Sequence, residues 1–216
     1  MKRNIFIFDM DGVIIDSEPL WREAQIKVLA EQNISITIED CIKHTMGKRI
    51  DDVAQKWCDL FGLKINPKIL ENKIIESVVR LIHAKGSAKL GLYELLDFLK
   101  QNNYTIALAT SSSMPIINAV FEKLSIAPYF EVINSADDEA YGKPHPAVYL
   151  RVIQKLQAAV ADCIVLEDSV TGMIAAKAAS MKTFVIPENP DDPRFTLADA
   201  VFPSMMALLY HLQKQH

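Results

Sequence analysis

Cysteine is scarce in this chain of 216 residues, and the three cysteines do not form the pattern of a site. Cys41, Cys58 and Cys163 are widely spaced, and none belongs to a Cys-x-x-Cys pair. Zinc ribbons and dithiol redox sites are built from such pairs. We therefore interpret all three residues as buried free thiols rather than as a zinc or redox centre.

Long apolar runs and an excess of basic charge are missing as well. No apolar run approaches the roughly 20 residues of a membrane-spanning helix, and Met1-Lys2-Arg3 leads into a short strand rather than into a signal-peptide core. The 23 Lys and Arg residues are outnumbered by 27 Asp and Glu residues, for a formal net charge of −4. No basic stripe is present that could neutralise a nucleic-acid backbone. We expect a monomeric cytoplasmic protein with no membrane or nucleic-acid partner.

The sequence does contain a regular alternation of short apolar segments and longer segments of helical spacing. The apolar segments suit strands buried on both faces of a parallel sheet and span residues 4–8, 105–109, 131–133, 163–166 and 182–186. Segments of helical spacing lie between them, at residues 92–100, 115–124, 146–156 and 172–179. This alternation predicts an α/β fold with a doubly wound parallel sheet.

One long stretch interrupts the alternation. Between about residues 17 and 85 no strand pattern appears, and Leu70, Ile74 and Val78 form an apolar stripe at helical spacing. We interpret the stretch as a small helical cap inserted after the first strand. The predicted division is a catalytic core of residues 1–16 and 86–216 and a cap domain of residues 17–85, with a flexible crossing near Gly86.

Four polar motifs follow the predicted strands or precede a predicted helix. In chain order they are Asp9 with Asp11, Thr110 with Ser111 and Ser112, Lys143, and the pair Glu167 and Asp168. The carboxyl ends of parallel strands meet at one edge of the sheet, where open α/β folds bind ligands. We therefore expect these side chains to lie together.

The residue types in these motifs indicate phosphoryl transfer. An aspartate such as Asp9 can act as a nucleophile and divide a hard hydrolysis into two easier displacements. Several carboxylates near a phosphate repel it, since a like-charge pair at 4 Å costs ~4 kcal/mol at an effective dielectric of 20. Mg²⁺ suits such a site because it binds carboxylates and phosphate oxygens, and Lys143 supplies a second cation. The Thr110 hydroxyl and the amides of Ser111 and Ser112 predict a phosphate-binding corner.

Together the motifs resemble those of the haloacid dehalogenase (HAD) superfamily, which has a Rossmann-like core and uses Mg²⁺. The resemblance implies that Asp9 is the nucleophile and a metal ligand, and that Asp11 is the general acid and base and gives the metal its backbone carbonyl. It also implies that Thr110 and Lys143 bind phosphate and that Asp168 binds the metal. Glu167 is implied either to bind the metal through a water molecule or to contact the residues that bind it directly. An Asp at position 11 further favours phosphate esters, because the dehalogenase and phosphonatase branches lack it.

Other segments look like the β-phosphoglucomutase-like group of that superfamily. These are Asp-Ser-Glu-Pro-Leu-Trp at residues 16–21 and Gly-Lys-Pro-His-Pro at residues 142–146. Within the group, residues 47–51, 166–175 and 192–195 are similar to bacterial hexitol phosphatase and 2-deoxyglucose-6-phosphate phosphatase proteins. The resemblance implies a phosphoric monoester hydrolase that acts on small sugar or sugar-alcohol phosphates.

Two alternatives remain beside hydrolysis. A mutase of the same group places a His on the first cap helix, where this chain has Trp21, and an indole cannot reproduce a proton-sensitive hydrogen bond of histidine. Phosphatase activity is therefore favoured over isomerase activity. A sugar-phosphate-binding protein that has lost catalysis is disfavoured, because all the catalytic residue types are present.

The cap should contact the carbon skeleton of the substrate, since the core handles only the phosphoryl group. Our candidates are Glu18, Trp21, Lys48 and Arg49. Trp21 could equally pack against a neighbouring helix. Lys48 and Arg49 could equally lie on the solvated surface. The sequence gives no role for His145.

Overall fold

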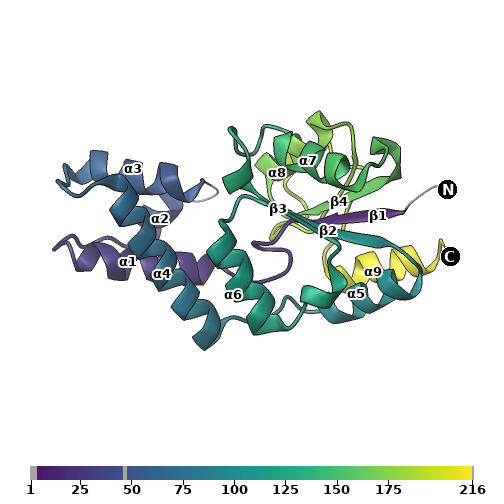
Figure 1. Ribbon diagram of the computed structural model, residues 1–216, viewed down its shortest axis with the longest axis horizontal. Coiled ribbons are helices and arrows are strands. Elements are labelled where there is room, and N and C mark those ends of the chain that lie inside the picture. Colours follow the sequence, from purple (N-terminus) through teal and green to yellow (C-terminus); the bar gives the residue numbers. More distant parts are fainter. Residues whose placement is uncertain (1–3, 46–47, 216) are drawn as a thin grey trace.

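The computed structural model describes residues 4–45 and 48–215, so Gly47 of the segment 47–51 and the tripeptide Met1-Lys2-Arg3 lie outside the described residues. Figure 1 shows two parts, a core built on a sheet and a group of helices beside it. The sheet is parallel throughout, with the strand order β3-β2-β1-β4-β5-β6. Its strands are β1 (Ile5–Phe8), β2 (Thr105–Thr110), β3 (Val132–Ser135), β4 (Cys163–Glu167), β5 (Lys182–Val185) and β6 (Ala200–Val201).

Helices cover both faces of the sheet. On one face lie α5 (Leu92–Gln101), α6 (Met114–Leu124) and α9 (Met205–Gln213), and on the other lie α7 (Ala147–Leu156) and α8 (Val170–Ala178) (Figure 1). Alternate residues of β1 divide between the two layers, because Phe6 and Phe8 pack with the first group of helices and Ile5 and Ile7 with the second. Burial on both faces explains why the central strands are continuous apolar runs.

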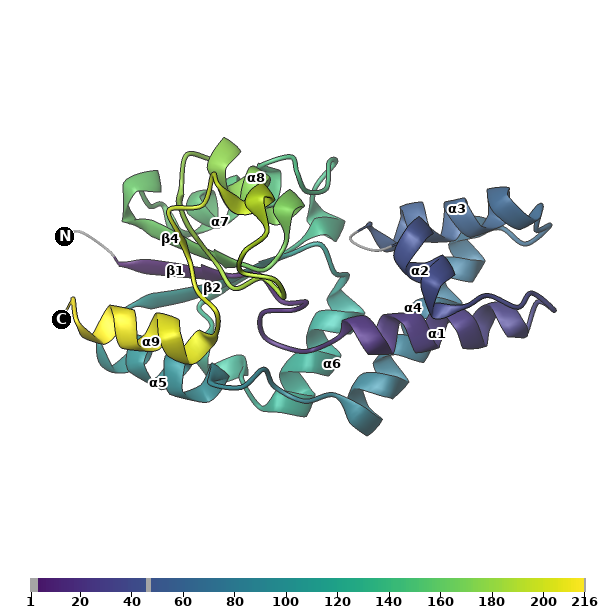
Figure 2. The same cartoon turned by 180° about the vertical axis from the view of Figure 1, so that it is seen from behind.

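The cap consists of α1 (Glu18–Ala30), α2 (Ile38–His44), α3 (Ile50–Phe61) and α4 (Pro67–Lys85). Local signals fix its helix ends: Thr37 and Asp40 form a capping box at the start of α2, and Asn66 caps α4 ahead of Pro67. Gly62 ends α3 in the left-handed conformation. Helix α4 leads back to the core and lies against α6, as both views show (Figures 1 and 2).

Two segments connect the cap to the core, and they lie side by side. Ile15, in the first connection, forms an antiparallel bridge with Ala88 in the second. The amide of Lys89 donates to the carbonyl of Ile14 at 2.9 Å. Within the described chain, no helix combines the length and the apolar character that a membrane crossing needs.

The predicted fold class is confirmed, with each predicted strand and core helix present and its bounds shifted by at most two residues. One strand and one α-helix of the core were not predicted. β6 is only two residues long, and α9 follows it near the end of the chain. The four cap helices occupy the stretch predicted to be helical, while the division into two domains at residues 16–17 and 85–86 stays a prediction.

Two isoleucines of α4 differ in burial, and their contributions to stability should differ accordingly. Ile74 is fully buried in the cap, whereas Ile69 on the same helix is 52% exposed. We expect Ile74→Ala to lower the free energy of unfolding by about 2–5 kcal/mol, and Ile69→Ala to change it by less than about 0.5 kcal/mol. Urea unfolding of both variants measures the difference, and equal losses would show that the cap does not pack as described.

Candidate active site

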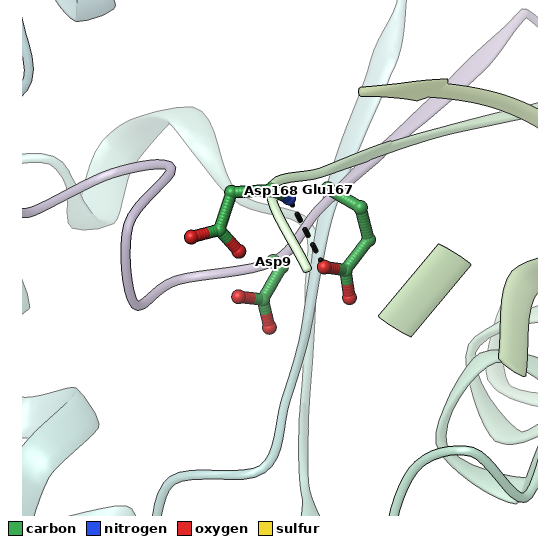
Figure 3. Close-up of side chains that lie close together, drawn as sticks. All are labelled: Asp9, Glu167 and Asp168. Carbon is green, nitrogen blue, oxygen red and sulfur yellow. Dashed lines mark hydrogen bonds between the residues drawn. The ribbon is translucent and has the colours of Figure 1, made fainter. Parts of the chain in front are cut away.

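The sheet register brings three strand ends together. Phe8 pairs with Leu108 of β2 and Leu166 of β4, so Asp9 emerges between the ends of these strands. The Asp9 amide donates to the Leu166 carbonyl at 2.9 Å and continues the ladder by one residue. Figure 3 shows Asp9, Glu167 and Asp168 gathered at this edge, and one carboxylate oxygen of each lies within 4.8 Å of the others.

Lys143 bridges two carboxylates of this group, those of Asp9 and Glu167. Its ammonium nitrogen is 2.6 Å from Asp9 Oδ1 and 2.6 Å from Glu167 Oε1, and it also donates to the carbonyl of Ala109 at 3.2 Å. All three of its protons therefore have acceptors. Burial works against the charged form, but the two carboxylates prevail and raise the pKa of Lys143 well above its usual value.

Glu167 has donors for both of its oxygens. Oε1 accepts from Lys143 and, at 2.6 Å, from the hydroxyl of the buried Tyr149, while Oε2 accepts from Ser169 Oγ at 3.0 Å. Oε2 also accepts from the amide of Asp168 at 3.1 Å, the bond drawn in Figure 3. Burial alone would raise the pKa of Glu167, but Lys143 and these hydrogen bonds hold it below its usual value. Glu167 is therefore a fixed anion that orients Lys143.

Two glycines leave the space that these carboxylates occupy. Gly12 has a φ of +80°, and a Cβ there would lie 1.9 Å from Asp168 Oδ2. A Cβ on Gly172, in the first turn of α8, would lie 1.8 Å from Glu167 Oε1. Any larger residue at either position would displace a carboxylate of the site.

Asp9 and Asp168 differ from Glu167, because hydrogen bonds and positive charges of the described residues do not fully offset the burial of their carboxylates. Burial, opposed by Lys143, raises the pKa of Asp9 to about 7. Burial and the charges of Glu167 and Asp9 raise the pKa of Asp168 well above its usual value, and no hydrogen-bond donor to its carboxylate is found in the described part of the chain. An unpartnered carboxylate beside a second one is the donor set that a hard divalent cation such as Mg²⁺ prefers. The residues present thus fit a magnesium site.

Asp11 lies next to this group, at the junction of core and cap. Its Oδ1 accepts a hydrogen bond from Ser17 Oγ and another from Trp21 Nε1 at 3.0 Å, while its Oδ2 accepts one from Ser112 Oγ at 2.6 Å. The prediction that an indole cannot reproduce the proton-sensitive hydrogen bond of the mutase histidine stays a prediction. Trp21 does reach Asp11, but its N–H does not titrate and can only donate.

The predicted phosphate-binding corner follows β2. Thr110 is buried, and its hydroxyl oxygen accepts from the Ser112 amide at 3.1 Å. The Ser112 carbonyl accepts from Ser135 Oγ at the end of β3 at 2.7 Å. Because α6 begins directly afterwards, the corner combines a helix N-terminus with hydroxyl groups.

A cavity of about 150 Å³ lies between core and cap over these residues. Asp9, Asp11, Thr110, Ser111, Ser112, Lys143 and Asp168 line it from the core, and Glu18, Trp21, Arg22, Gln25 and Lys48 are among its cap residues. Burial and the charge of Asp11 raise the pKa of Glu18. All the predicted site residues thus line this cavity except Glu167, which is fully buried next to Asp9 and Lys143, and Arg49.

Arg49 lies elsewhere. It lines a second, open cavity of about 590 Å³ beside the loop that carries Lys143. Its side chain passes so close to Gly142 that a Cβ there would lie 2.5 Å from Arg49 Cδ, and its guanidinium donates to the Glu139 carbonyl at 3.4 Å. In this arrangement Arg49 joins cap to core and does not face Asp9.

Comparison with known proteins identifies the family. The family model of haloacid dehalogenase-like hydrolases matches residues 4–180. The chain belongs to the haloacid dehalogenase-like hydrolase family. It is 35% identical over 206 residues to hexitol phosphatase B of Escherichia coli K12, which covers 94% of this chain and 92% of that protein. It is 31% identical to a phosphorylated carbohydrates phosphatase of Thermotoga maritima, over 82% of this chain and 81% of the relative.

Among solved structures, β-phosphoglucomutase from Clostridium difficile superposes with a TM-score of 0.81 over 99% of this chain and 96% of its own, at 24% identity. At that identity the likeness shows the fold alone. A putative β-phosphoglucomutase from Thermotoga maritima is 28% identical and superposes with a TM-score of 0.79 over 98% of this chain and 99% of its own. The expectation of a phosphoric monoester hydrolase of the HAD superfamily, in its β-phosphoglucomutase-like group, is confirmed.

Several residues of this HAD-type site were not predicted from the sequence. Tyr149 and Ser17 act through contacts that only the fold creates. Gln25 stands four residues after Trp21, a spacing that places both on one helix face. His145, which had no predicted role, accepts from the Ala147 amide through Nδ1 at 3.2 Å at the start of α7 and packs on Tyr141, with ring centroids 5.0 Å apart.

The hydrogen bond from Tyr149 to Glu167 should contribute more to stability than a similar bond at the surface. Tyr149→Phe removes a donor to a buried carboxylate, so we expect the free energy of unfolding to fall by about 1.5–3 kcal/mol. The matched control is Tyr129→Phe, which removes a 2.7 Å hydrogen bond to Asp97 that is exposed to solvent and should cost less than about 0.5 kcal/mol. Denaturant unfolding measures both, and equal costs would contradict the described burial.

Proposed function

We propose that this hydrolase releases phosphate from small sugar or sugar-alcohol phosphates through a phosphoryl-enzyme formed on Asp9. The observation that carries the proposal is the arrangement of Asp9 at a strand end, 2.6 Å from the ammonium group of Lys143, with Asp11 beside it. The hexitol phosphatase and carbohydrate phosphatase relatives support a sugar or polyol skeleton. The polar side chains of the cap wall, Glu18, Arg22 and Lys48, suit a ligand with several hydroxyl groups.

The residues of the chain divide the reaction into two displacements. In the first, a carboxylate oxygen of Asp9 forms a bond to phosphorus, the bond to the sugar oxygen breaks, and Asp11 gives that oxygen its proton. In the second, water attacks the acyl phosphate, Asp11 takes back a proton from the water, and inorganic phosphate leaves with Asp9 regenerated. Lys143 holds Asp9 in place, and Thr110 and Ser112 bind the phosphate oxygens.

The proposal includes Mg²⁺, held by the carboxylates of Asp9 and Asp168 with the backbone carbonyl of Asp11. When bound, the ion offsets the repulsion between these carboxylates and the phosphate and polarises the phosphoryl group. Glu167 is engaged by Lys143 and Tyr149, which supports a place for it beside the ion or linked to it through water. A monomeric state and a cytoplasmic location stay predictions.

Magnesium should stabilise the folded protein through Asp168. A ligand at about 100 times its Kd adds about 2.7 kcal/mol to the free energy of unfolding, so we expect Tm to rise with MgCl₂ and to fall back with a chelator. Asp168→Asn should remove the rise, whereas Asp191→Asn at an exposed position should keep it. Calorimetry of the metal-free and loaded proteins measures this, and an unchanged Mg²⁺ response in Asp168→Asn would refute the site.

A phosphate-release assay tests the proposed function directly. Over a panel of hexitol, hexose and smaller phosphates we expect Mg²⁺-dependent turnover, and Asp9→Asn should reduce it by about 10³-fold or more while the protein stays folded, since the nucleophile is lost. Near-normal turnover by Asp9→Asn would contradict the role of Asp9. Conversion of β-glucose 1-phosphate to glucose 6-phosphate at a rate above phosphate release would show an isomerase instead.

A further inference from the structure

The three hydrogen-bond donors to Asp11 come from two parts of the molecule. Ser17 and Trp21 belong to the start of α1 in the cap, and both donate to Oδ1. Ser112 belongs to the corner after β2 in the core and donates to Oδ2. Two donors fill the lone pairs of Oδ1, so Oδ2, which has a single donor, is the oxygen through which Asp11 can exchange a proton with a leaving group.

We propose that Trp21 is a positioning residue, whose indole N–H holds Asp11 Oδ1 while the substrate phosphate draws Ser112 away from Oδ2. The inference rests on the proposed function, because it concerns the acid and base of that reaction. Ser112 lies in the corner formed with Thr110, and a phosphate bound there competes with Asp11 as an acceptor for the Ser112 hydroxyl. Oδ2 is then released toward the cavity, where the leaving oxygen lies.

The indole is better suited to this task than the hydroxyl of Ser17. A hydroxyl rotates and can turn to another acceptor, whereas the direction of an indole N–H is fixed by its ring. The ring plane then decides where Oδ1 is held. An Asp11 anchored at Oδ1 can turn only about that anchor, so the freed Oδ2 stays near the phosphate instead of swinging into solvent.

The cap interior fixes Trp21 in turn. Gln25 donates from Nε2 to the Trp21 carbonyl at 3.2 Å. Its Oε1 accepts from Thr45 Oγ1 and from Trp57 Nε1, each at 2.9 Å. Gln25 is buried, so this network joins α1 to the end of α2 and to α3. The indole that donates to Asp11 is therefore held in place by hydrogen bonds inside the cap.

The test compares two substrates that differ in their need for a proton. A sugar alkoxide leaves poorly unless protonated, whereas the p-nitrophenolate of p-nitrophenyl phosphate leaves without a proton. We expect Trp21→Phe and Trp21→Leu, which lack the donor, to lower the single-turnover rate of phosphoryl transfer to Asp9 by roughly 10–100-fold for the hexitol phosphate and by less than about threefold for p-nitrophenyl phosphate, with KM little changed. Trp21→His, which keeps an N–H donor, should recover part of the loss. Asp11→Asn should show the same selectivity more strongly.

Trp57→Phe is the matched control, because it also removes an indole N–H from the cap but does not touch Asp11. It reaches Asp11 only through Gln25 and Trp21, so it should lower Tm and change the ratio of the two transfer rates less than the Trp21 variants do. Equal losses on both substrates in the Trp21 variants, or a rise in KM on the sugar phosphate alone, would overturn the inference and leave a packing or sugar-stacking role. A wild-type protein that turns over no phosphate ester would instead overturn the proposed function and this inference with it.

Discussion

The ammonium group of Lys143 is the interaction on which the site depends. It is buried between Asp9 and Glu167, at 2.6 Å from each, and no other ammonium or guanidinium of the described residues bonds to these carboxylates. Without it, several buried carboxylates would face one another at a cost of several kcal/mol per pair. The parallel sheet makes the arrangement possible, because its register fixes Asp9 and Glu167 at neighbouring strand ends while the loop before α7 brings Lys143 over both. This edge of the sheet thus holds three carboxylates, those of Asp9, Glu167 and Asp168, beside one ammonium group.

The two members of the acidic pair therefore differ in chemistry although they are adjacent in sequence. Glu167 receives donors on both oxygens and stays ionised in a buried place. Asp168 has no donor in the described chain, and its neighbours raise its pKa. A carboxylate already satisfied by protein gains little from a metal, whereas one that is crowded by other anions gains much. This contrast explains why the fold can tolerate one buried acid and still leave a second available to a cation.

Sequence reasoning succeeded where a local pattern determines structure. A run such as Ile5–Phe8 must be a buried strand, and a carboxylate directly after it must lie at the sheet edge, so Asp9 and Glu167 could be placed in advance. It failed where tertiary contacts determine the position of a side chain. Arg49 lies against the loop that carries Lys143, and Tyr149 donates to Glu167 only because α7 packs on the sheet. β6 was too short to leave a periodic signal. The cap residues were the hardest to place, because their role depends on how the cap sits on the core.

The hydrogen bond from Trp21 to Asp11 bears on the choice between hydrolysis and isomerisation. A histidine at this position could change its charge during turnover and so alter its hold on Asp11, but an indole N–H donates in the same way at every stage. In the proposed mechanism, such a donor would keep Asp11 near the phosphate in both displacements, the first of which needs an acid and the second a base. A donor that does not change suits an enzyme that transfers the phosphoryl group from Asp9 to water. Such an enzyme does not have to reorient a sugar between its two steps.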